Sequence, residues 1–244
     1  MDPSHPLGCE DDSYPVVDNL THAYQHLVGS LLFLQLCSCL DISFAVLMLS
    51  QFCLVPLSRH YAIARRVLRY LKGTKSFRLH YGGARRSELL AGLSDADWVG
   101  DKARRASISG FMWSYGGGPI SWLAKKQNCI ALSSTEAEYI ALTRTVQEGI
   151  WLRNSLQQIG VPCPSSLVIS TDNNRALSLA SNDSSHGKAK HIDIRYHFIH
   201  SHIENGNIDI LHTPGIINTA DLFTKSLGCV KFQDHVARIG LGTR

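Results

Sequence analysis

The stretch LLAGLSD, residues 89–95, is a short apolar run that ends on a single acid, Asp95. The stretch SLVISTD, residues 166–172, has the same form and ends on Asp172. Between them, residues 134–158 carry a long helical pattern. Strands on either side of a long helix are typical of a mixed α/β layer, in which strand ends and helix starts converge on one edge of the sheet.

The segments between residue 95 and residue 134 extend this pattern. Residues 109–115 and 119–123 are short, rich in strand formers and separated by a glycine-bearing turn, as expected of an antiparallel meander with residues 89–95. The order predicted from Glu88 onward is three strands, a helix, a strand, a helix, a longer helix, a strand and a helix. This order predicts a mixed α/β layer fold.

Four isolated acids stand at the predicted strand ends and in the helical patterns: Asp95, Glu138, Asp172 and Asp221. Mg²⁺ prefers oxygen ligands, and clustered carboxylates repel one another unless such an ion neutralises them. Two ions about 3.5–4 Å apart are a standard arrangement for cutting phosphodiester bonds. Taken singly, each acid has a plainer interpretation as a turn residue, a helix cap or a solvated helix residue.

Eight strings resemble the C-terminal end of the Pol polyprotein of copia-type LTR retrotransposons, in that family's order, from about residue 23 to about residue 228. They are LVGSLLFL, HYAIARRVLRYLKGT, SDADWVGD, GGGPISWLAKKQ, ALSSTEAEYIAL, STDNNRALSLA, KHIDIRYHFI and TADLFTKSL. The resemblance implies a reverse-transcriptase connection or thumb region followed by a ribonuclease H domain with a mixed five-stranded sheet flanked by helices. We expect a loose tail over 1–22, a helical region over 23–73, a linker over 74–87, the ribonuclease H domain over 88–228, and a short helix and tail over 229–244.

The resemblance implies that all four acids hold two Mg²⁺ ions, for which Mn²⁺ can substitute. It selects Glu138 rather than Glu136, because the string SSTEAEY places the ligand immediately before the tyrosine. Asp97 and Asp101 are expected to stay outside the site. The implied reaction is hydrolysis of the RNA strand of an RNA–DNA hybrid, in which one ion activates a water and the other stabilises the leaving 3′ oxygen. His212, in LHTPG, corresponds by position to the loop histidine of many ribonuclease H domains and is expected to shuttle a proton or help the product leave.

Contacts with the hybrid are expected from small polar and basic residues. The 2′-hydroxyl of RNA donates and accepts hydrogen bonds. Polar side chains that contact it can therefore select RNA over DNA as the strand that is cut. The same residues serve equally well as caps and turn formers. The polar set is Ser133, Ser134, Thr135 and Asn173, with Gly116–Gly118 allowing close backbone approach. The basic set for the hybrid backbone is Lys188, Lys190, His191 and Arg195.

A dense group of histidines invites a zinc interpretation. It has no cysteine partners, and its spacing fits no common zinc finger. We therefore favour a basic patch with inward-packing apolar neighbours. The group consists of His186, His191, His197, His200 and His202.

The segment Leu27 to Leu49 is long and apolar enough to resemble a membrane span. Asp41 argues against a span, because a carboxylate well inside a spanning helix costs roughly 2.5–3.5 kcal/mol. The resemblance implies instead two buried helices broken near Cys39. At this break the chain reads CSCLD, without the arginine and proline that the family shows.

A second helix is predicted from Ser58, its expected cap, to about Lys72. Arg65, Arg69 and Lys72 line one of its faces. Such a stripe is either a solvated helix face or a contact for a nucleic-acid backbone.

Composition allows these interpretations without demanding them. The chain has 244 residues, 44% of them hydrophobic, and a formal net charge of +4, which tolerates an anionic partner. Its seven cysteines form no Cys-x-x-Cys pair and are odd in number, so we expect reduced thiols in an intracellular protein. The first twenty residues are acidic and carry prolines without an apolar core, unlike a secretory signal.

Two departures from the family bear on activity. The Tyr-Val-Asp-Asp string and the upstream palm are absent, so we expect no polymerase activity from this chain by itself. Two features indicate sequence drift. One is the string CSCLD, and the other is Ala106, which stands where a second basic residue is expected before SISG. A catalytically silent nucleic-acid-binding remnant and a membrane-tethered protein therefore remain as alternatives. The expected partners are the hybrid and an upstream reverse-transcriptase palm in a longer polyprotein.

Overall fold

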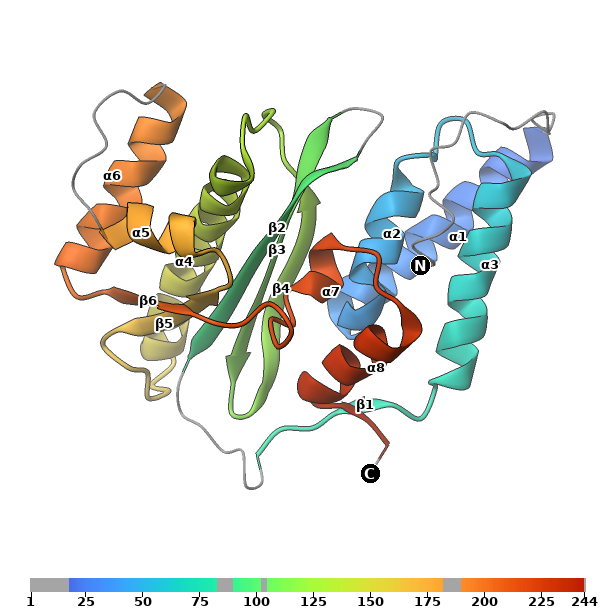
Figure 1. The fold of residues 1–244 in the computed structure, drawn as a ribbon. Coiled ribbons are helices and arrows are strands. Elements are labelled where there is room, and N and C mark those ends of the chain that lie inside the picture. Colours follow the sequence, from blue (N-terminus) through green and yellow to red (C-terminus); the bar gives the residue numbers. More distant parts are fainter. Residues whose placement is uncertain (1–17, 83–89, 102–104, 182–189, 244) are drawn as a thin grey trace.

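The computed structural model describes residues 18–82, 90–101, 105–181 and 190–243 (Figure 1). A five-stranded mixed sheet lies at its centre, with helices on both faces. The order of its elements from residue 91 to residue 224 is the order predicted from the sequence. The prediction of a ribonuclease H-like mixed sheet flanked by helices and preceded by a helical region is confirmed.

The sheet has the strand order β4-β3-β2-β5-β6. The first three strands in this order are antiparallel, whereas β5 runs parallel to both β2 and β6. The predicted strand over 167–171 is found with the predicted ends, while the three meander strands extend further than predicted. The strands are β2 (Ala91–Asp101), β3 (Ala106–Tyr115), β4 (Gly118–Lys126), β5 (Leu167–Thr171) and β6 (Ile208–His212).

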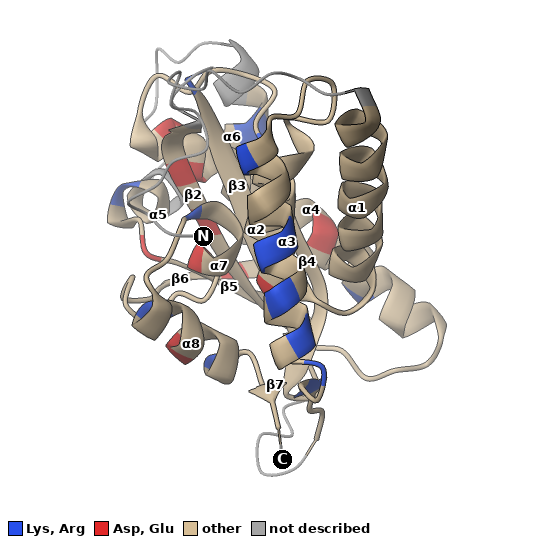
Figure 2. Cartoon of the chain, turned by 90° about the vertical axis from the view of Figure 1, so that its right-hand side faces the viewer, with Lys and Arg blue, Asp and Glu red and all other residues tan. Residues whose placement is uncertain are grey.

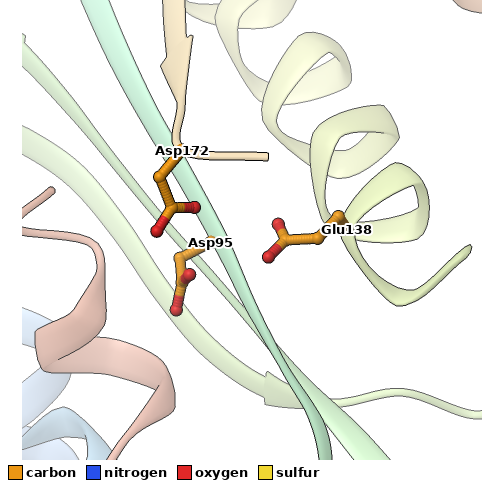
Figure 3. Close-up of side chains that lie close together, drawn as sticks. All are labelled: Asp95, Glu138 and Asp172. Carbon is orange, nitrogen blue, oxygen red and sulfur yellow. The ribbon is translucent and has the colours of Figure 1, made fainter. Parts of the chain in front are cut away.

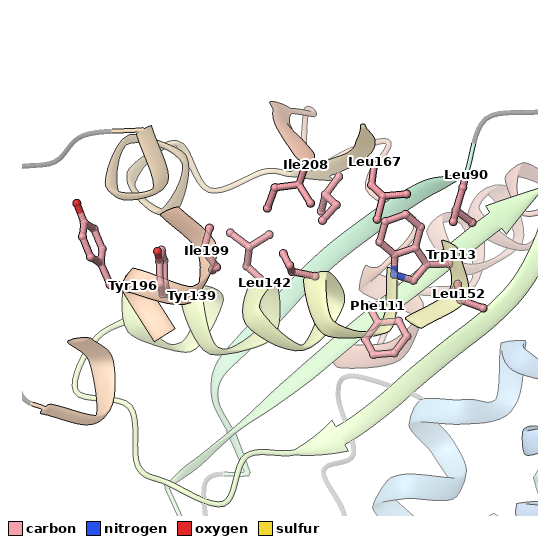
Figure 4. Packing of buried hydrophobic residues seen from close by; sticks show 12 residues of the cluster. Leu90, Phe111, Trp113, Tyr139, Leu142, Leu152, Leu167, Tyr196, Ile199 and Ile208 are labelled. Carbon is pink, nitrogen blue, oxygen red and sulfur yellow. The ribbon is translucent and has the colours of Figure 1, made fainter. Parts of the chain in front are cut away.

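Side chains alternate between the two faces of the sheet, as the pleat requires. Phe111 and Trp113 of β3 face α4 (Ser134–Gln158) and join the core drawn in Figure 4. Met112, between them, joins the opposite core with Phe223. Two further helices, α5 (Asn174–Ser181) and α6 (Lys190–Glu204), lie on the α4 side (Figure 1).

Trp113 sets how closely α4 approaches the sheet. Its ring is fully buried, and its indole nitrogen donates to the Thr145 carbonyl at 3.0 Å. Cβ atoms added to Gly92 or Gly149 would lie 2.8 Å and 2.2 Å from this ring. Glycine on both the strand and the helix therefore makes room for the indole between them.

The N-terminal helices are α1 (Asp18–Cys37), the short 3₁₀ helix η1 (Leu40–Ile42), α2 (Ser43–Ser50) and α3 (Ser58–Gly73). The apolar segment is thus broken at Cys39, as predicted. No helix among the described residues is long and apolar enough to cross a membrane. Ser58 is the first residue of α3 and not its cap, because the cap position belongs to Leu57 in extended backbone.

The helical region shares a core with the sheet. Leu40 is fully buried among Met112, Leu222 and Phe223. The indole nitrogen of Trp122 in β4 donates to the carbonyl of Gln35 in α1 at 2.9 Å. The helix α2 also packs against β4 and against α7 (Asp221–Thr224).

The C-terminal segment contains two helices where the sequence suggested one apolar helix opening at Asp221. The helix α7 has only four residues, because the backbone becomes extended at Lys225. A separate helix, α8 (Cys229–Arg238), follows. The strand β7 (Leu241–Gly242) then pairs with β1 (Arg78–Leu79), which lies within residues 74–87.

Candidate metal centre

Three of the four predicted acids meet at one place. Carboxylate oxygens of Asp95, Glu138 and Asp172 all lie within 4.8 Å of one another (Figure 3). Asp95 comes from the middle of the sheet in β2, Asp172 directly follows β5, and Glu138 extends from the first turns of α4. Within the described part of the chain, this is the one group of side chains close enough to hold a metal ion.

The parallel register of β2 and β5 brings the two aspartates together. Leu93 pairs with Ser170, and two residues further along the respective strands lie Asp95 and Asp172. Because parallel strands advance in step, both side chains reach the same part of the sheet edge where β5 ends. Asp172 lies under the loop after β6, where a Cβ on Gly215 would stand 2.8 Å from its Oδ2.

The start of α4 explains why Glu138, and not Glu136, belongs to the group. The Ser133 hydroxyl accepts a hydrogen bond from the Glu136 amide, and the Glu136 carboxylate accepts one from the Leu132 amide at 2.7 Å. Glu136 is therefore engaged in a reciprocal cap of the helix start. Two residues later, the Glu138 carboxylate is directed toward Asp95 (Figure 3).

Burial and mutual repulsion give two of these carboxyl groups unusual proton affinities. Burial, followed by the charges of Asp95 and Asp172, raises the pKa of Glu138 to about 9. Burial also raises the pKa of Asp95 to about 6, against the opposing effect of Lys225. Ionised, the group therefore concentrates negative charge in a site with little access to water.

The donor set fits a hard divalent cation. All three ligand groups are carboxylates, which Mg²⁺ and Mn²⁺ accept as oxygen ligands. Oε2 of Glu138 is buried and has no hydrogen-bond partner. A buried carboxylate oxygen without a partner is costly, and a cation bound by the group would satisfy it.

Asp221 lies outside the three-carboxylate group. Its Oδ1 accepts from the Lys225 ammonium at 2.5 Å, and its Oδ2 accepts from the Lys231 ammonium at 2.5 Å. Burial opposes ionisation of Asp221, but the hydrogen bonds and charges of the two lysines outweigh it and lower the pKa. The same Lys225 nitrogen also lies 3.0 Å from Asp95 Oδ1, so it bridges two of the predicted acids.

Lys225 and Thr224 were not predicted as site residues. The Thr224 hydroxyl donates to Asp95 Oδ2, so both oxygens of Asp95 are contacted from the segment around α7. The only sequence signal was the spacing of Asp221 and Lys225, four residues apart in TADLFTK, which suits a helical ion pair. That spacing does not reveal the contact with Asp95.

Gly110 allows α7 to come this close. It lies opposite Asp95 in the β2–β3 ladder. A Cβ at this position would stand 2.7 Å from the Phe223 Cβ and 2.7 Å from the Thr224 Cγ2. The absence of a side chain therefore lets α7 pack directly on the strand beside Asp95.

The other predicted site residues, His212, Ser134, Thr135 and Asn173, lie on or beside elements next to the three-carboxylate group. His212 is exposed at the end of β6, in register with Thr171, the residue before Asp172. Ser134 is exposed and Thr135 half-buried on the first turn of α4. Asn173 follows Asp172, but its side-chain oxygen accepts from the Arg175 and Ala176 amides and so caps α5.

The Gly116–Gly118 turn does not reach the carboxylates. Gly116 lies six residues along the chain from Gly110, or roughly 20 Å of extended strand. Gly116 and Gly117 form the β3–β4 turn with φ of 62° and 85°, and Gly118 begins β4. Asp97 is also outside the metal-binding group, as predicted, and the Asp101 side chain is outside the described residues.

The basic and histidine residues gather around α6. Arg195 is half-buried, with a guanidinium nitrogen 4.0 Å from the Cys129 sulfur in the loop before α4. The ring of His200 lies 4.2 Å from that of Tyr196. Residues His186 and Lys188, and the side chains of Lys190 and His191, lie outside the described residues. The described cysteines are free: Cys37, Cys39, Cys53, Cys129, Cys163 and Cys229.

The sheet order, the helix placement and the three carboxylates that meet on β2, on α4 and after β5 define a ribonuclease H-like domain. The chain is 39% identical over 210 residues to the retrovirus-related Pol polyprotein from transposon TNT 1-94 of Nicotiana tabacum. This match covers 86% of the chain and 16% of that polyprotein. The chain is 38% identical to the corresponding polyprotein from transposon RE1 of Arabidopsis thaliana, covering 89% of this chain and 15% of that protein. The chain belongs to the family of retrovirus-related Pol polyproteins of transposons, and it spans about a sixth of the length of these relatives.

Other comparisons complete this picture. Secreted RxLR effector protein 161 of Plasmopara viticola is 43% identical over 129 residues, covering 53% of this chain and 90% of that protein. No protein-family model matches the chain. Among solved structures, ribonuclease H1 of Halobacterium salinarum matches with 14% identity and a TM-score of 0.39, over 55% of this chain and 93% of that one. A foamy viral protease-reverse transcriptase matches with 10% identity and a TM-score of 0.44, over 83% of this chain and 33% of that one.

Proposed function

We propose that this chain is a metal-dependent ribonuclease H, which hydrolyses the RNA strand of an RNA–DNA hybrid as one part of a transposon Pol polyprotein. The observation that carries the proposal is the clustering of Asp95, Glu138 and Asp172 within 4.8 Å of one another. The three acids are far apart in sequence, and their mutual repulsion favours a bound cation. The resemblance to the C-terminal part of copia-type Pol polyproteins implies the RNA–DNA hybrid as the substrate, and the match to the transposon TNT 1-94 polyprotein supports that resemblance.

A bound divalent ion such as Mg²⁺ or Mn²⁺ would supply an activated water and neutralise charge on the phosphate that is cut. Asp95, Glu138 and Asp172 would hold it through carboxylate oxygens, including the unpartnered Oε2 of Glu138. His212, at the end of β6, is close enough in register to serve the same edge of the sheet. Its imidazole would shuttle a proton at this edge or help the product leave.

Residues around the carboxylates would bind the hybrid. Ser134 and Thr135 present hydroxyl groups on the first turn of α4, one turn before Glu138, where a ribose 2′-hydroxyl would be recognised. Asn173 lies beside Asp172 and retains its amide N–H₂ as a donor. Arg195 would contact a phosphate of the backbone together with Lys188 and Lys190.

The basic face of α3 is a second surface for the nucleic-acid backbone. Arg65, Arg69 and Lys72 are exposed, and Figure 2 shows basic residues following one another along this helix. Charges in such a row match the repeating phosphates of a duplex. This contact would not depend on the metal.

The decisive test is cleavage of a labelled RNA–DNA hybrid by the purified chain with Mg²⁺ or Mn²⁺. We expect hybrid-specific cutting of the RNA strand that stops with a chelator, and Asp95→Asn should lower the rate by more than about 100-fold, since even partners of metal ligands are worth up to that much. Glu136→Gln is the matched control, because Glu136 is a neighbouring buried acid that caps α4 and leaves the cluster unchanged. A folded chain that binds the hybrid but cuts it no faster than Asp95→Asn would support the catalytically silent nucleic-acid-binding remnant instead.

A further inference from the structure

The surroundings of Asp221 show a fixed positive charge within the candidate centre. Lys225 Nζ lies 2.5 Å from Asp221 Oδ1 and 3.0 Å from Asp95 Oδ1. The Lys225 ammonium therefore lies between Asp95, which belongs to the three-carboxylate group, and Asp221, which does not. Any second cation shared by Asp95 and Asp221 would have to displace it.

The lysine is held firmly in this place. Asp95 is fully buried and Asp221 is 2% exposed, whereas the Lys225 side chain is 33% exposed. A charged hydrogen bond to a buried carboxylate is among the stronger interactions in a protein. Removing the ammonium would leave both carboxylates short of a partner, since Lys231 reaches only the other oxygen of Asp221.

The charges of the centre also favour a single divalent ion. The four acids carry four negative charges when all are ionised, and Lys225 and Lys231 carry two positive charges. One divalent cation balances the remaining two. A second divalent ion would leave the free protein with excess positive charge at a largely buried site, which is costly.

We propose that the Lys225 ammonium serves as a built-in cation in place of a second metal ion. The free protein then binds one divalent ion through Asp95, Glu138 and Asp172, and Asp221 anchors Lys225 instead of binding metal. Lys225 is in this sense a positioning residue, which fixes Asp95 and α7 relative to each other. The inference rests on the proposed function, because it concerns the same site.

The test is the stoichiometry of Mn²⁺ binding to the purified chain, measured by calorimetry and by the electron paramagnetic resonance signal of free Mn²⁺. We expect one ion per wild-type chain and two per Lys225→Met chain, because methionine removes the charge but keeps a side chain of similar length. Lys225→Arg should keep one ion. Lys231→Met is the matched control: it removes an equal charge from the same Asp221 but leaves the Lys225 bridge, so it should also bind one ion.

A second variant keeps the inference testable if Lys225→Met does not fold. Asp221→Asn should still bind one Mn²⁺, because Asp221 is not a ligand of the ion in this arrangement. Two ions in the wild type, falling to one in Asp221→Asn, would overturn the inference while leaving metal-dependent cleavage intact. One bound ion without any cutting of the hybrid would instead overturn the proposed function, and a chain that binds no Mn²⁺ would overturn both.

Discussion

Glu138 makes the metal-free protein sensitive to pH. Burial and the neighbouring aspartates raise its pKa from 4.5 to about 9, so the folded protein holds this proton more tightly than the unfolded chain does. An acid with a raised pKa contributes most to stability below its unfolded pKa, and that contribution is lost as the pH rises toward the folded value. With a chelator present, the melting temperature of the wild type should therefore fall from about pH 4.5 to about pH 9 relative to that of Glu138→Gln.

Thermal unfolding of both proteins over this pH range measures the effect. Glu136→Gln should keep the wild-type slope, because the Glu136 carboxylate is bound to a backbone amide and lies outside the cluster. Added Mg²⁺ should restore the wild type at high pH, since the ion replaces the proton, and should do so less for Glu138→Gln. Parallel curves for the wild type and Glu138→Gln would show that Glu138 is ionised in the metal-free protein.

At the scale of residues, the sequence predicted the acids better than their partners. Asp95, Glu138 and Asp172 were recognisable because each stands in a distinctive string, and the structure brings them together. The position of Asp221 was not predictable in the same way, because its carboxylate is bound by two lysines. Those contacts depend on where α7 packs, which no local pattern of residues specifies.

At the scale of elements, Gly110 controls the packing of α7 on β3. An alanine there would place its Cβ 2.7 Å from both Phe223 and Thr224, in a helix that cannot easily move because Phe223 is fully buried. We expect Gly110→Ala to destabilise the protein by about 1–3 kcal/mol, the usual cost of overpacking. Urea unfolding measures this loss. Gly242→Ala is the control, because nothing lies within 4 Å of a Cβ at that position, and equal midpoints for the two variants would contradict the packing argument.

Elements with strong local patterns were predicted nearly to the residue. The helix α4 and the strand β5 begin and end where their sequence patterns indicated. The strand β2 continues to Asp101, past the predicted end at Asp95, because its partner β3 begins earlier than its own pattern suggests. The β1–β7 pair joins residues more than 160 positions apart, and two-residue strands carry no periodic signal.

At the scale of the whole molecule, the N-terminal helices complete the hydrophobic core of the sheet. The sequence predicted these helices, but not that Leu40 would fill the core beside α7 or that Trp122 would bind the Gln35 carbonyl. Since α7 carries Asp221 and is followed directly by Lys225, the helical region supports the segment that contacts Asp95. Stability of the N-terminal helices should therefore be linked to that of the candidate centre.

This linkage predicts one cooperative unfolding transition. The four tryptophans, Trp98, Trp113, Trp122 and Trp151, all lie outside α1, α2 and α3. Their fluorescence therefore reports on the sheet and α4, and Trp122 reports in addition on the contact with α1. Leu31→Ala removes a fully buried side chain from the N-terminal helices and should cost about 2–5 kcal/mol.

If the two parts unfold together, Leu31→Ala lowers the midpoint of the fluorescence transition and the midpoint of the circular dichroism transition by the same amount. Leu36→Ala is the control on the same helix, because Leu36 is 68% exposed and its removal should leave both midpoints unchanged. A Leu31→Ala protein whose helical signal melts early while its tryptophan transition stays at the wild-type midpoint would show two independent units. In that case the contacts of Leu40 and Gln35 would not couple the two parts, and the Lys225 bridge would owe its geometry to Gly110 and α7 alone.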